Sequence, residues 1–565
     1  MGERRTDSLP ARRDRGSFEP DVADPSQDTQ PPSLGGSAAE LLSACARQPA
    51  VLARIELALA GRLALIALGR TPMSVDTADR RFAHPAWRRR APFRRALQGY
   101  LAWSHSLREL IEALRVDAQT RERLRFVVEH VVAAGAPSNL CLTHPGFYDN
   151  LVATRGRSLL NGLRQLVDDW RHNDGLPRQV DPAAFRVGRD LAATPGAVIF
   201  RNDLFELIQY APRRAEVDAR PLLFVPPQIN KYYVLDLAPD NSLVRHALEA
   251  GQQVFMISWR NPTAAQRDWG LDAYVGAVGD AVDIVWGIGG EQPVKLVGAC
   301  AGGLTAAIAL ALAHRRGRAA RVACLSLFVT LLGELTDSAS SRGTFGNRAI
   351  RHALAHSSRT GVLDGADLAR AFAWLRPDDL IWRFVTNNYV LGQRPPAHDI
   401  LFWNADTTRL PARLHADLLS IYTADSLRTP RGVHIDETAI DLSEIDQDVF
   451  IVAGARDHIT PWTACFRTTR LLDTNMRFVL ADAGHVQTVV SPPRSGGGYL
   501  SDTCARDEAA ADWQERAPRR DGSWWPEWFD WCRARGGPTV AASMRYGNDA
   551  HEPIEAAPGR YVRQR

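Results

Sequence analysis

The residues most clearly arranged for chemistry are a cysteine and the two glycines that flank it. Residues 294–305 read VKLVGACAGGLT, so a short apolar run leads into Gly298, Cys300 and Gly302 and then into an alanine-rich segment. A sharp strand-to-helix turn needs glycine two residues before and after a nucleophile, because the backbones there approach too closely for side chains. The pattern predicts Cys300 as a nucleophile, and a thiol at this position favours thiol and thioester substrates.

An acid and a histidine follow two later apolar runs, in the order that this kind of turn requires. Asp457 comes after the run 449–453, and His485 comes after the run 477–480. In the fold built on this turn, the nucleophile, acid and histidine appear in that order, with the last two on loops after late strands. Each residue alone is weak evidence, but the ordered set predicts a triad with Cys300.

The predicted positions suggest a role for each member of the triad. Cys300 would stand at the N-terminus of a helix, where the helix dipole favours a thiolate. His485 would accept the thiol proton, and Asp457 would hold the imidazole in the right tautomer. His458 is a competing base, which we interpret as a residue that packs the loop.

Two backbone N–H groups are predicted to form an oxyanion hole. Ala301, which follows the nucleophile, would supply one of them. The other should come from the loop after the apolar run 222–225, where Ile229 or Asn230 could supply it. Ile229 is the first candidate, and Asn230 stays open as the alternative.

The elements that must position these residues alternate between short strands and helices. The apolar, β-branched runs lie at 198–200, 222–225, 253–257, 294–297, 322–327, 449–454 and 477–480. Their alternation with helical stretches predicts a parallel sheet covered by helices. A polar, aromatic and helical segment at about 333–445 interrupts the alternation. The order predicts an α/β-hydrolase fold with a large cap inserted before the last strands.

The N-terminal third has a different character. Residues 1–38 are rich in Arg, Asp, Ser, Pro and Gly and are predicted to form a disordered tail. Residues 39–195 are predicted to form a mostly helical domain, and 196–565 the catalytic domain. Helices are expected at 39–69, 94–115, 118–134 and 157–171. The first of these is interpreted as packing on a core, with contact to a hydrophobic body or partner as the alternative.

Composition excludes several classes of function. The 565 residues are 45% hydrophobic and 23% charged with a net charge of +4, which is ordinary for a globular protein and gives no reason to expect nucleic acid. The seven cysteines show no paired spacing, so neither a zinc site nor a disulfide framework is indicated, and a reducing cytoplasm fits. No signal peptide is visible. The uncharged run 296–313 is interpreted as a buried strand and helix, so no transmembrane segment is expected.

Longer motifs resemble those of the polyhydroxyalkanoate synthases over roughly residues 40–565. Besides the turn at 298–303, they are FVPPQINKYYVLDL at 224–237, SWRNP at 258–262, FWNADTTRLP at 402–411 and DHITPW at 457–462. The C-terminal APGRYV at 557–562 resembles the medium-chain (class II) branch of the family. Many members carry Ser at the position of Ala301, and either residue leaves the backbone N–H available.

The resemblance implies an acyltransferase that polymerises (R)-3-hydroxyacyl-CoA into polyester and releases CoA, through a covalent thioester on Cys300. It implies no cofactor and no metal. It also implies a homodimer in the cytoplasm, at the surface of polyester granules, with granule-associated proteins as candidate partners and with dimer or granule contacts in the N-terminal domain. The alternatives are an acyl-CoA thioesterase or esterase of the same fold and a non-catalytic granule-associated protein.

Overall fold

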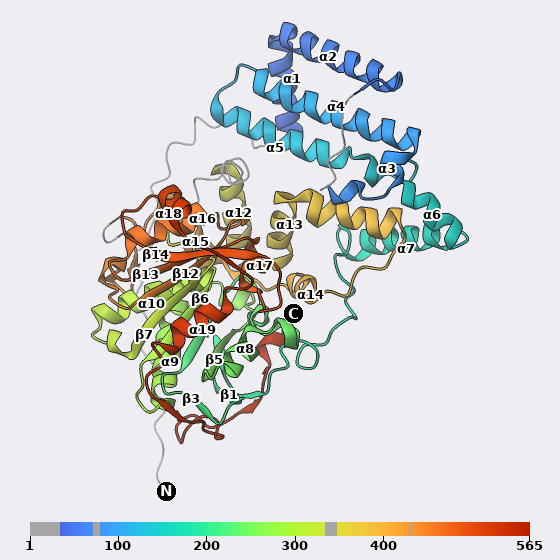
Figure 1. Ribbon diagram of the computed structural model, residues 1–565. Coiled ribbons are helices and arrows are strands. Elements are labelled where there is room, and N and C mark those ends of the chain that lie inside the picture. Colours follow the sequence, from blue (N-terminus) through green and yellow to red (C-terminus); the bar gives the residue numbers. More distant parts are fainter. Residues whose placement is uncertain (1–33, 72–78, 334–346, 430–431) are drawn as a thin grey trace.

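The chain folds into a helical N-terminal region, a largely helical cap and a large sheet flanked by helices (Figure 1). The computed structural model describes residues 34–71, 79–333, 347–429 and 432–565. The predicted α/β-hydrolase fold with a helical N-terminal region is confirmed. Within the described residues, no helix is both long and apolar enough to cross a membrane.

Eleven strands form the central sheet, in the order β15-β14-β13-β12-β7-β6-β4-β5-β2-β1-β17. They are β1 (Gly196–Arg201), β2 (Phe205–Tyr210), β4 (Leu222–Val225), β5 (Val254–Trp259), β6 (Val294–Ala299), β7 (Val322–Phe328), β12 (Val449–Gly454), β13 (Met476–Ala481), β14 (Gly498–Cys504), β15 (Arg519–Asp521) and β17 (Glu555–Ala556). All seven predicted runs are strands of this sheet. A separate antiparallel pair is formed by β3 (Glu216–Asp218) and β16 (Thr539–Ala541).

The sheet is mixed, and the prediction of a parallel sheet holds only for its centre. Strands β13, β12, β7, β6, β4 and β5 pair in parallel, whereas β14 and β15 at one edge and β2, β1 and β17 at the other pair antiparallel. Residues 202–204, which join β1 to β2, are too few for the crossover that a parallel pair needs. The edge strands therefore turn back on their neighbours.

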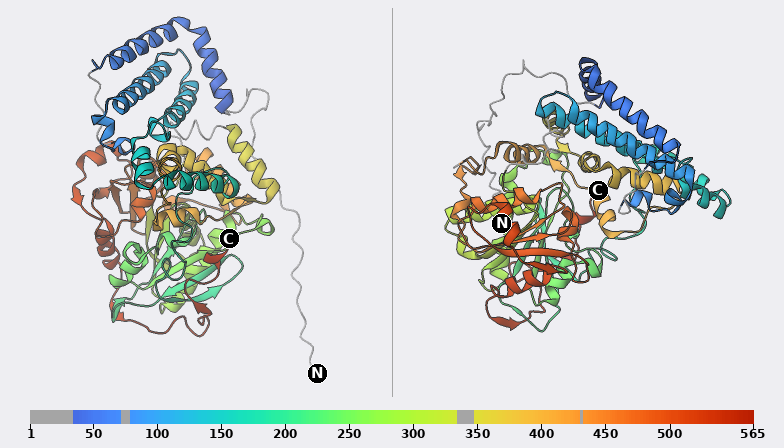
Figure 2. Two further views of the ribbon diagram at one scale, coloured as in Figure 1. Left: turned by 90° about the vertical axis from the view of Figure 1, so that its right-hand side faces the viewer. Right: turned by 45° about the horizontal axis from the view of Figure 1, so that its top comes forward.

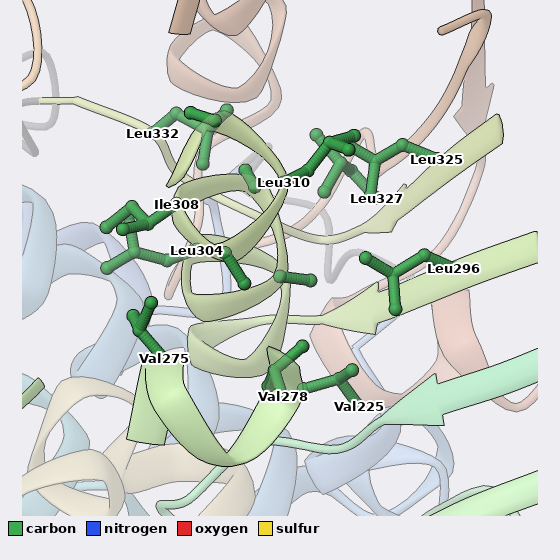
Figure 3. Packing of buried hydrophobic residues seen from close by; sticks show 14 of the residues in the cluster. Val225, Val275, Val278, Leu296, Leu304, Ile308, Leu310, Leu325, Leu327 and Leu332 are labelled. Atoms are coloured by element: carbon green, nitrogen blue, oxygen red, sulfur yellow. The ribbon is translucent and has the colours of Figure 1, made fainter. Parts of the chain in front are cut away.

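Helices cover both faces of the sheet, because the central strands are apolar along their whole length and their successive side chains point to opposite faces. The helices of this region are α8 (Leu243–Glu249), α9 (Leu271–Ile288), α10 (Ala301–Arg315), α16 (Trp462–Arg467), α17 (His485–Val489), α18 (Ala510–Arg516) and α19 (Trp525–Arg533). Leu223 and Val225 of β4 belong to the core with α9 and α10, which Figure 3 shows at close range. Leu222 and Phe224 belong to the core on the other face, with α8 and α19.

Between β7 and β12 the chain forms a largely helical cap, and residues 334–346 of it lie outside the described residues. Its elements are α12 (Asn347–Thr360), β8 (Val362–Leu363), α13 (Gly365–Leu375), the π-helical turns η8 (Asp378–Trp382) and η9 (Val385–Val390), α14 (Asp399–Ala405), β9 (Leu410–Pro411), α15 (Ala412–Ala424), β10 (His434–Ile435) and β11 (Thr438–Ala439).

The N-terminal region consists of α1 (Leu34–Arg47), α2 (Pro49–Ala67), α3 (Ala86–Arg89), α4 (Ala91–Ala113), α5 (Ala118–Ala134), α6 (Pro145–Ala153) and α7 (Arg157–His172). The helices expected near 94–115, 118–134 and 157–171 are confirmed. The segment expected to be helical at 39–69 is helical, but it forms two helices, because Gln48 before Pro49 leaves the helical conformation with φ −131°. Helix α1 begins at Leu34, inside the segment predicted as a tail, and residues 1–33 lie outside the described residues.

The N-terminal helices are joined to the cap, which lies between them and the sheet (Figures 1 and 2). The ring of His130 on α5 is hydrogen-bonded through Nε2 to the carbonyl of Trp374, at 2.7 Å. Arg81 pairs with Asp378 of η8 at 2.9 Å. The cap thus contacts the N-terminal region on one side and the sheet region on the other.

Candidate active site

Cys300 stands at the sharp turn between β6 and α10, at the centre of the sheet. The two preceding residues pair with both neighbouring strands, Gly298 with Val225 and Ala299 with Phe328. Cys300 itself has φ 50° and ψ −123°, a left-handed conformation that costs energy in a residue with a side chain. Such strain in a central turn is typical of a nucleophile that must project from the end of a sheet.

Close backbone contacts explain the glycines on either side of the turn. A Cβ atom on Gly298 would lie 2.4 Å from the Cα atom of Gly303. A Cβ atom on Gly302 would lie 2.3 Å from the carbonyl oxygen of Val225, at the end of β4. Both distances are far below ordinary contact, so a side chain at either position would force the strand, the helix and the loop after β4 apart.

His485 and Asp457 meet at the same edge of the sheet, each on a loop that follows a parallel strand. Gly454 at the end of β12 is in register with Ala481 at the end of β13, so the two loops start side by side. The Nδ1 atom of His485 lies 2.7 Å from Oδ2 of Asp457, to which it donates. The acid is fully buried and the ring nearly so.

Thr460 completes this pair, and sequence reasoning assigned it no role. Its hydroxyl donates to Oδ2 of Asp457 at 2.7 Å, and its oxygen lies 3.1 Å from Nδ1 of His485. The backbone N–H groups of Ile459 and Thr460 donate to Oδ1 of Asp457 at 2.8 and 2.9 Å. An Asp whose carboxylate accepts from residues two and three positions later forms a common local turn, and this spacing is the signal that could have revealed Thr460.

The charges of the site favour an ionised acid and a strongly basic histidine. Burial opposes ionisation of Asp457, but the neighbouring imidazole and the hydrogen bonds from Thr460 outweigh it and lower the pKa of the carboxyl. Burial also opposes charge on His485, yet Asp457 and the nearby Cys300 thiol raise the pKa of the imidazole to about 10. Since Asp457 occupies Nδ1, the ring nitrogen that faces the thiol is Nε2. The structure thus brings all three predicted residues together.

Other residues of the same types are less suited to this chemistry. Burial lowers the pKa of His458 to about 4, which fits its interpretation as a packing residue. Five of the seven cysteines are buried, and burial raises the pKa of Cys465 well above its ordinary value. Cys141 is half-buried like Cys300, but it lies in the N-terminal region, between α5 and α6.

The structure supports one of the two predicted oxyanion donors more directly than the other. Ala301 is the first residue of α10, where backbone N–H groups have no partner within the helix. Ile229 is half-buried and packs against the core on the α10 side of the sheet. Asn230 forms an isolated β-bridge with Thr407 of the cap. The choice between Ile229 and Asn230 stays a prediction.

The cap contributes Tyr422, on α15, to the surroundings of the site. Burial raises the pKa of its hydroxyl, and the nearby thiols of Cys300 and Cys465 would raise it further when ionised. The residue lies more than a hundred positions from the nucleophile along the chain, and no local motif marks it. Only the fold brings it within electrostatic range of the Cys300 thiol.

The turn, the order of the three residues and the sheet define an α/β-hydrolase. Comparison of the sequence with known families agrees: residues 222–492 match the model described as "alpha/beta hydrolase fold", and residues 78–247 match "Poly-beta-hydroxybutyrate polymerase (PhaC) N-terminus".

Individual relatives identify the family. The chain is 46% identical to poly(3-hydroxyalkanoate) polymerase 2 of Ectopseudomonas oleovorans over 91% of this chain and 92% of the relative, and 41% identical to polymerase 1 of the same organism over 94% and 95%. It is 39% identical to poly(3-hydroxyalkanoate) polymerase subunit PhaC of Cupriavidus necator over 86% and 83%. The chain belongs to the poly(3-hydroxyalkanoate) polymerase family, and it is an acyltransferase of the kind that makes polyester.

Proposed function

We propose that the protein polymerises (R)-3-hydroxyacyl-CoA through a thioester on Cys300, with His485 as the base and Asp457 as its partner. The observation that carries the proposal is the strained turn that presents Cys300 to an imidazole whose far nitrogen is bonded to a buried carboxylate at 2.7 Å. Membership of the polymerase family supports the choice of substrate class.

The first half of the reaction loads the enzyme. His485 takes the proton of the Cys300 thiol, and the thiolate attacks the thioester carbonyl of the substrate. The tetrahedral oxyanion is stabilised by the N–H of Ala301 and by the loop after β4. The carbon–sulfur bond to CoA then breaks, CoA leaves with the proton from the imidazolium, and an acyl thioester remains on Cys300. Exchange of one thioester for another is nearly isoenergetic, so loading is reversible.

The second half of the reaction extends the chain. His485 removes the proton from the 3-hydroxyl of a monomer, whose oxygen attacks the thioester on Cys300. An oxoester forms and the thiol is regenerated. Because an oxoester is more stable than a thioester, elongation runs downhill. This energetic difference accounts for a cysteine at a turn that carries serine in ordinary hydrolases.

A thioesterase of the same fold would use the same residues but would give water access to the acyl-enzyme. Tyr422 on α15 of the cap lies within electrostatic range of Cys300, which supports restricted access of water. Incubation with 3-hydroxydecanoyl-CoA, followed by thiol release and sizing of the product, tests the proposal. Polyester of high mass is expected, whereas free 3-hydroxy acid in equal amount to CoA would indicate a thioesterase. No release of CoA would indicate a non-catalytic granule protein.

The preferred monomers are expected to be of medium chain length. The motifs SWRNPT at 258–263 and QRDWG at 266–270, together with the C-terminal APGRYV, resemble the medium-chain branch. We expect monomers of six to twelve carbons to be used better than the four-carbon monomer, because a pocket shaped for a longer acyl chain gains binding from each added methylene. The ratio kcat/KM for four- and ten-carbon substrates measures this preference. A higher ratio for the four-carbon substrate would contradict it.

We further propose that the enzyme is a cytoplasmic homodimer and that it contacts its polyester product. Helix α7 supports a granule contact because one of its faces is apolar and exposed. The side chains of this face are Leu159, Leu160, Leu163, Leu166, Val167 and Trp170, with Trp170 74% exposed. Soluble proteins seldom leave such a continuous apolar face uncovered. We propose that the α7 face lies on the polyester surface.

Charges placed on the α7 face should release the enzyme from polyester. We expect Leu163→Glu with Trp170→Glu to lower the fraction bound to polyester particles about tenfold or more, since burial of one large apolar side chain contributes about 1.5–3 kcal/mol. Asn161→Glu on the polar side of the same helix is the matched control and should bind normally. Release of CoA from soluble substrate should not change. If binding persists while the dimer dissociates in sedimentation, the face joins two subunits instead.

A further inference from the structure

The loop after β4, residues 226–233, is held against the nucleophile helix from one side. The amide of Gln228 is buried and donates to the hydroxyl of Thr305 on α10 at 2.9 Å. The indole of Trp259 donates to the carbonyl of Pro226 at 2.8 Å. These contacts fix the start of the loop, and they leave its second half, beyond Gln228, to other partners.

The cap holds the same loop from the opposite side. The hydroxyl of Thr408 donates to the carbonyl of Gln228 at 3.2 Å. The backbones of Asn230 and Thr407 form an antiparallel bridge. The segment that contains the two candidate oxyanion donors therefore lies between α10 and the cap, with direct bonds to both.

Asp406 makes the strongest of these links. One carboxylate oxygen accepts from the ammonium of Lys231 at 2.6 Å, and the other accepts from the hydroxyl of Tyr233 at 2.9 Å. The indole of Trp403 donates to the carbonyl of Lys231 at 2.7 Å. The Lys231 side chain is 3% exposed, and burial lowers the pKa of its ammonium, an effect that Asp406 opposes. A buried ammonium without this partner would be costly, so the pair fixes where the loop can lie.

We propose that Asp406 is a positioning residue, which sets the distance between the oxyanion donor at Ile229 or Asn230 and the carbonyl attacked by Cys300. The inference rests on the proposed function. It also gives the cap a second task. Asp406 belongs to the cap, so the oxyanion hole is complete only when the cap is packed against the loop after β4. Acyl transfer is therefore slow whenever the cap is displaced and water can enter.

Comparison of two reactions of Cys300 in the full-length Asp406→Asn variant tests this inference. Acylation by 3-hydroxydecanoyl-CoA passes through an oxyanion, whereas alkylation by iodoacetamide displaces iodide at a saturated carbon and needs none. We expect the single-turnover rate of CoA release to fall about 10- to 100-fold. Removal of one oxyanion donor lowers kcat by a factor of about 10²–10³, and here the donor is displaced but not removed. Alkylation of the peptide that carries Cys300, followed by mass spectrometry, should keep its wild-type rate.

Three further variants separate positioning from general damage. Asp406→Glu keeps the charge and should recover part of the acylation rate. The double variant Lys231→Met with Asp406→Leu removes both charges of the pair, so we expect it to unfold at the wild-type temperature and still to be acylated slowly. Asp240→Asn breaks the exposed pair with Arg494, at 2.7 Å, and should change neither reaction. Equal acylation by Asp406→Asn and the wild type, or an equal loss of alkylation, would overturn the inference. Failure of the wild type itself to release CoA would overturn the proposed function.

Discussion

Cys300→Ala should release no CoA and carry no acyl label, although its fold is intact. Removal of a nucleophile from a comparable triad lowers kcat by about six orders of magnitude, which places the variant below detection. The reason here is structural as well as chemical: Cys300 is the one cysteine at a strained backbone turn, and its thiol contributes to the raised pKa of His485. Labelling with radioactive 3-hydroxydecanoyl-CoA, followed by gel separation under denaturing conditions, measures the loss.

Two companion variants make this result specific. Cys141→Ala removes the other half-buried cysteine and should leave both labelling and CoA release unchanged. Cys300→Ser keeps a nucleophile at the turn, but its hydroxyl is a far weaker acid than a thiol. Its acyl-enzyme would also be an oxoester, so that transfer to a monomer hydroxyl is no longer downhill. Label retained by Cys300→Ala would move the nucleophile elsewhere and refute the mechanism.

Local signals were sufficient to predict that Cys300, Asp457 and His485 lie together at one edge of the sheet. The glycines around Cys300 are required because a Cβ atom at Gly298 or Gly302 would lie only 2.4 or 2.3 Å from a neighbouring backbone atom, and such close packing leaves a short pattern in the sequence. Asp457 and His485 follow strands that are themselves recognisable as apolar runs. Parallel strands bring their carboxyl ends to one edge, so the order of the runs was enough to predict that the three residues meet.

Contacts between distant segments could not be predicted in this way. Lys231 meets Asp406 and Tyr422 approaches Cys300 only because the cap folds back over the sheet, and no spacing along the chain records this. The antiparallel edge strand β14 also escaped prediction, because polar residues interrupt its apolar pattern. The break at Gln48 could have been predicted from Pro49, since the residue before proline avoids the helical conformation.

Asp457→Asn should still load one acyl group on Cys300 but should elongate the chain poorly. Both oxygens of Asp457 accept hydrogen bonds from Thr460, Ile459 or His485, and the side chain is fully buried, which favours action through the imidazole over direct contact with a monomer hydroxyl. Asparagine removes the negative charge that raises the pKa of His485, and burial then makes the ring a weaker base. A thiol, with an ordinary pKa near 8.5, tolerates a weaker base than an alcohol does.

Single-turnover CoA release and steady-state polymer formation distinguish the two phases. We expect acylation to fall about tenfold and elongation by about 10³–10⁴, the loss seen when the acid of a related triad is replaced by its amide. His485 must be unprotonated to act as the base, so its pKa sets the acidic limb of the elongation profile. Because Asp457 raises that pKa, the acidic limb should move to lower pH in the variant. Thr460→Val, which keeps the carboxylate and removes one hydroxyl bond, should shift this limb much less. Equal losses in both phases would mean that Asp457 orients His485 and contributes nothing to the basicity that the monomer hydroxyl requires.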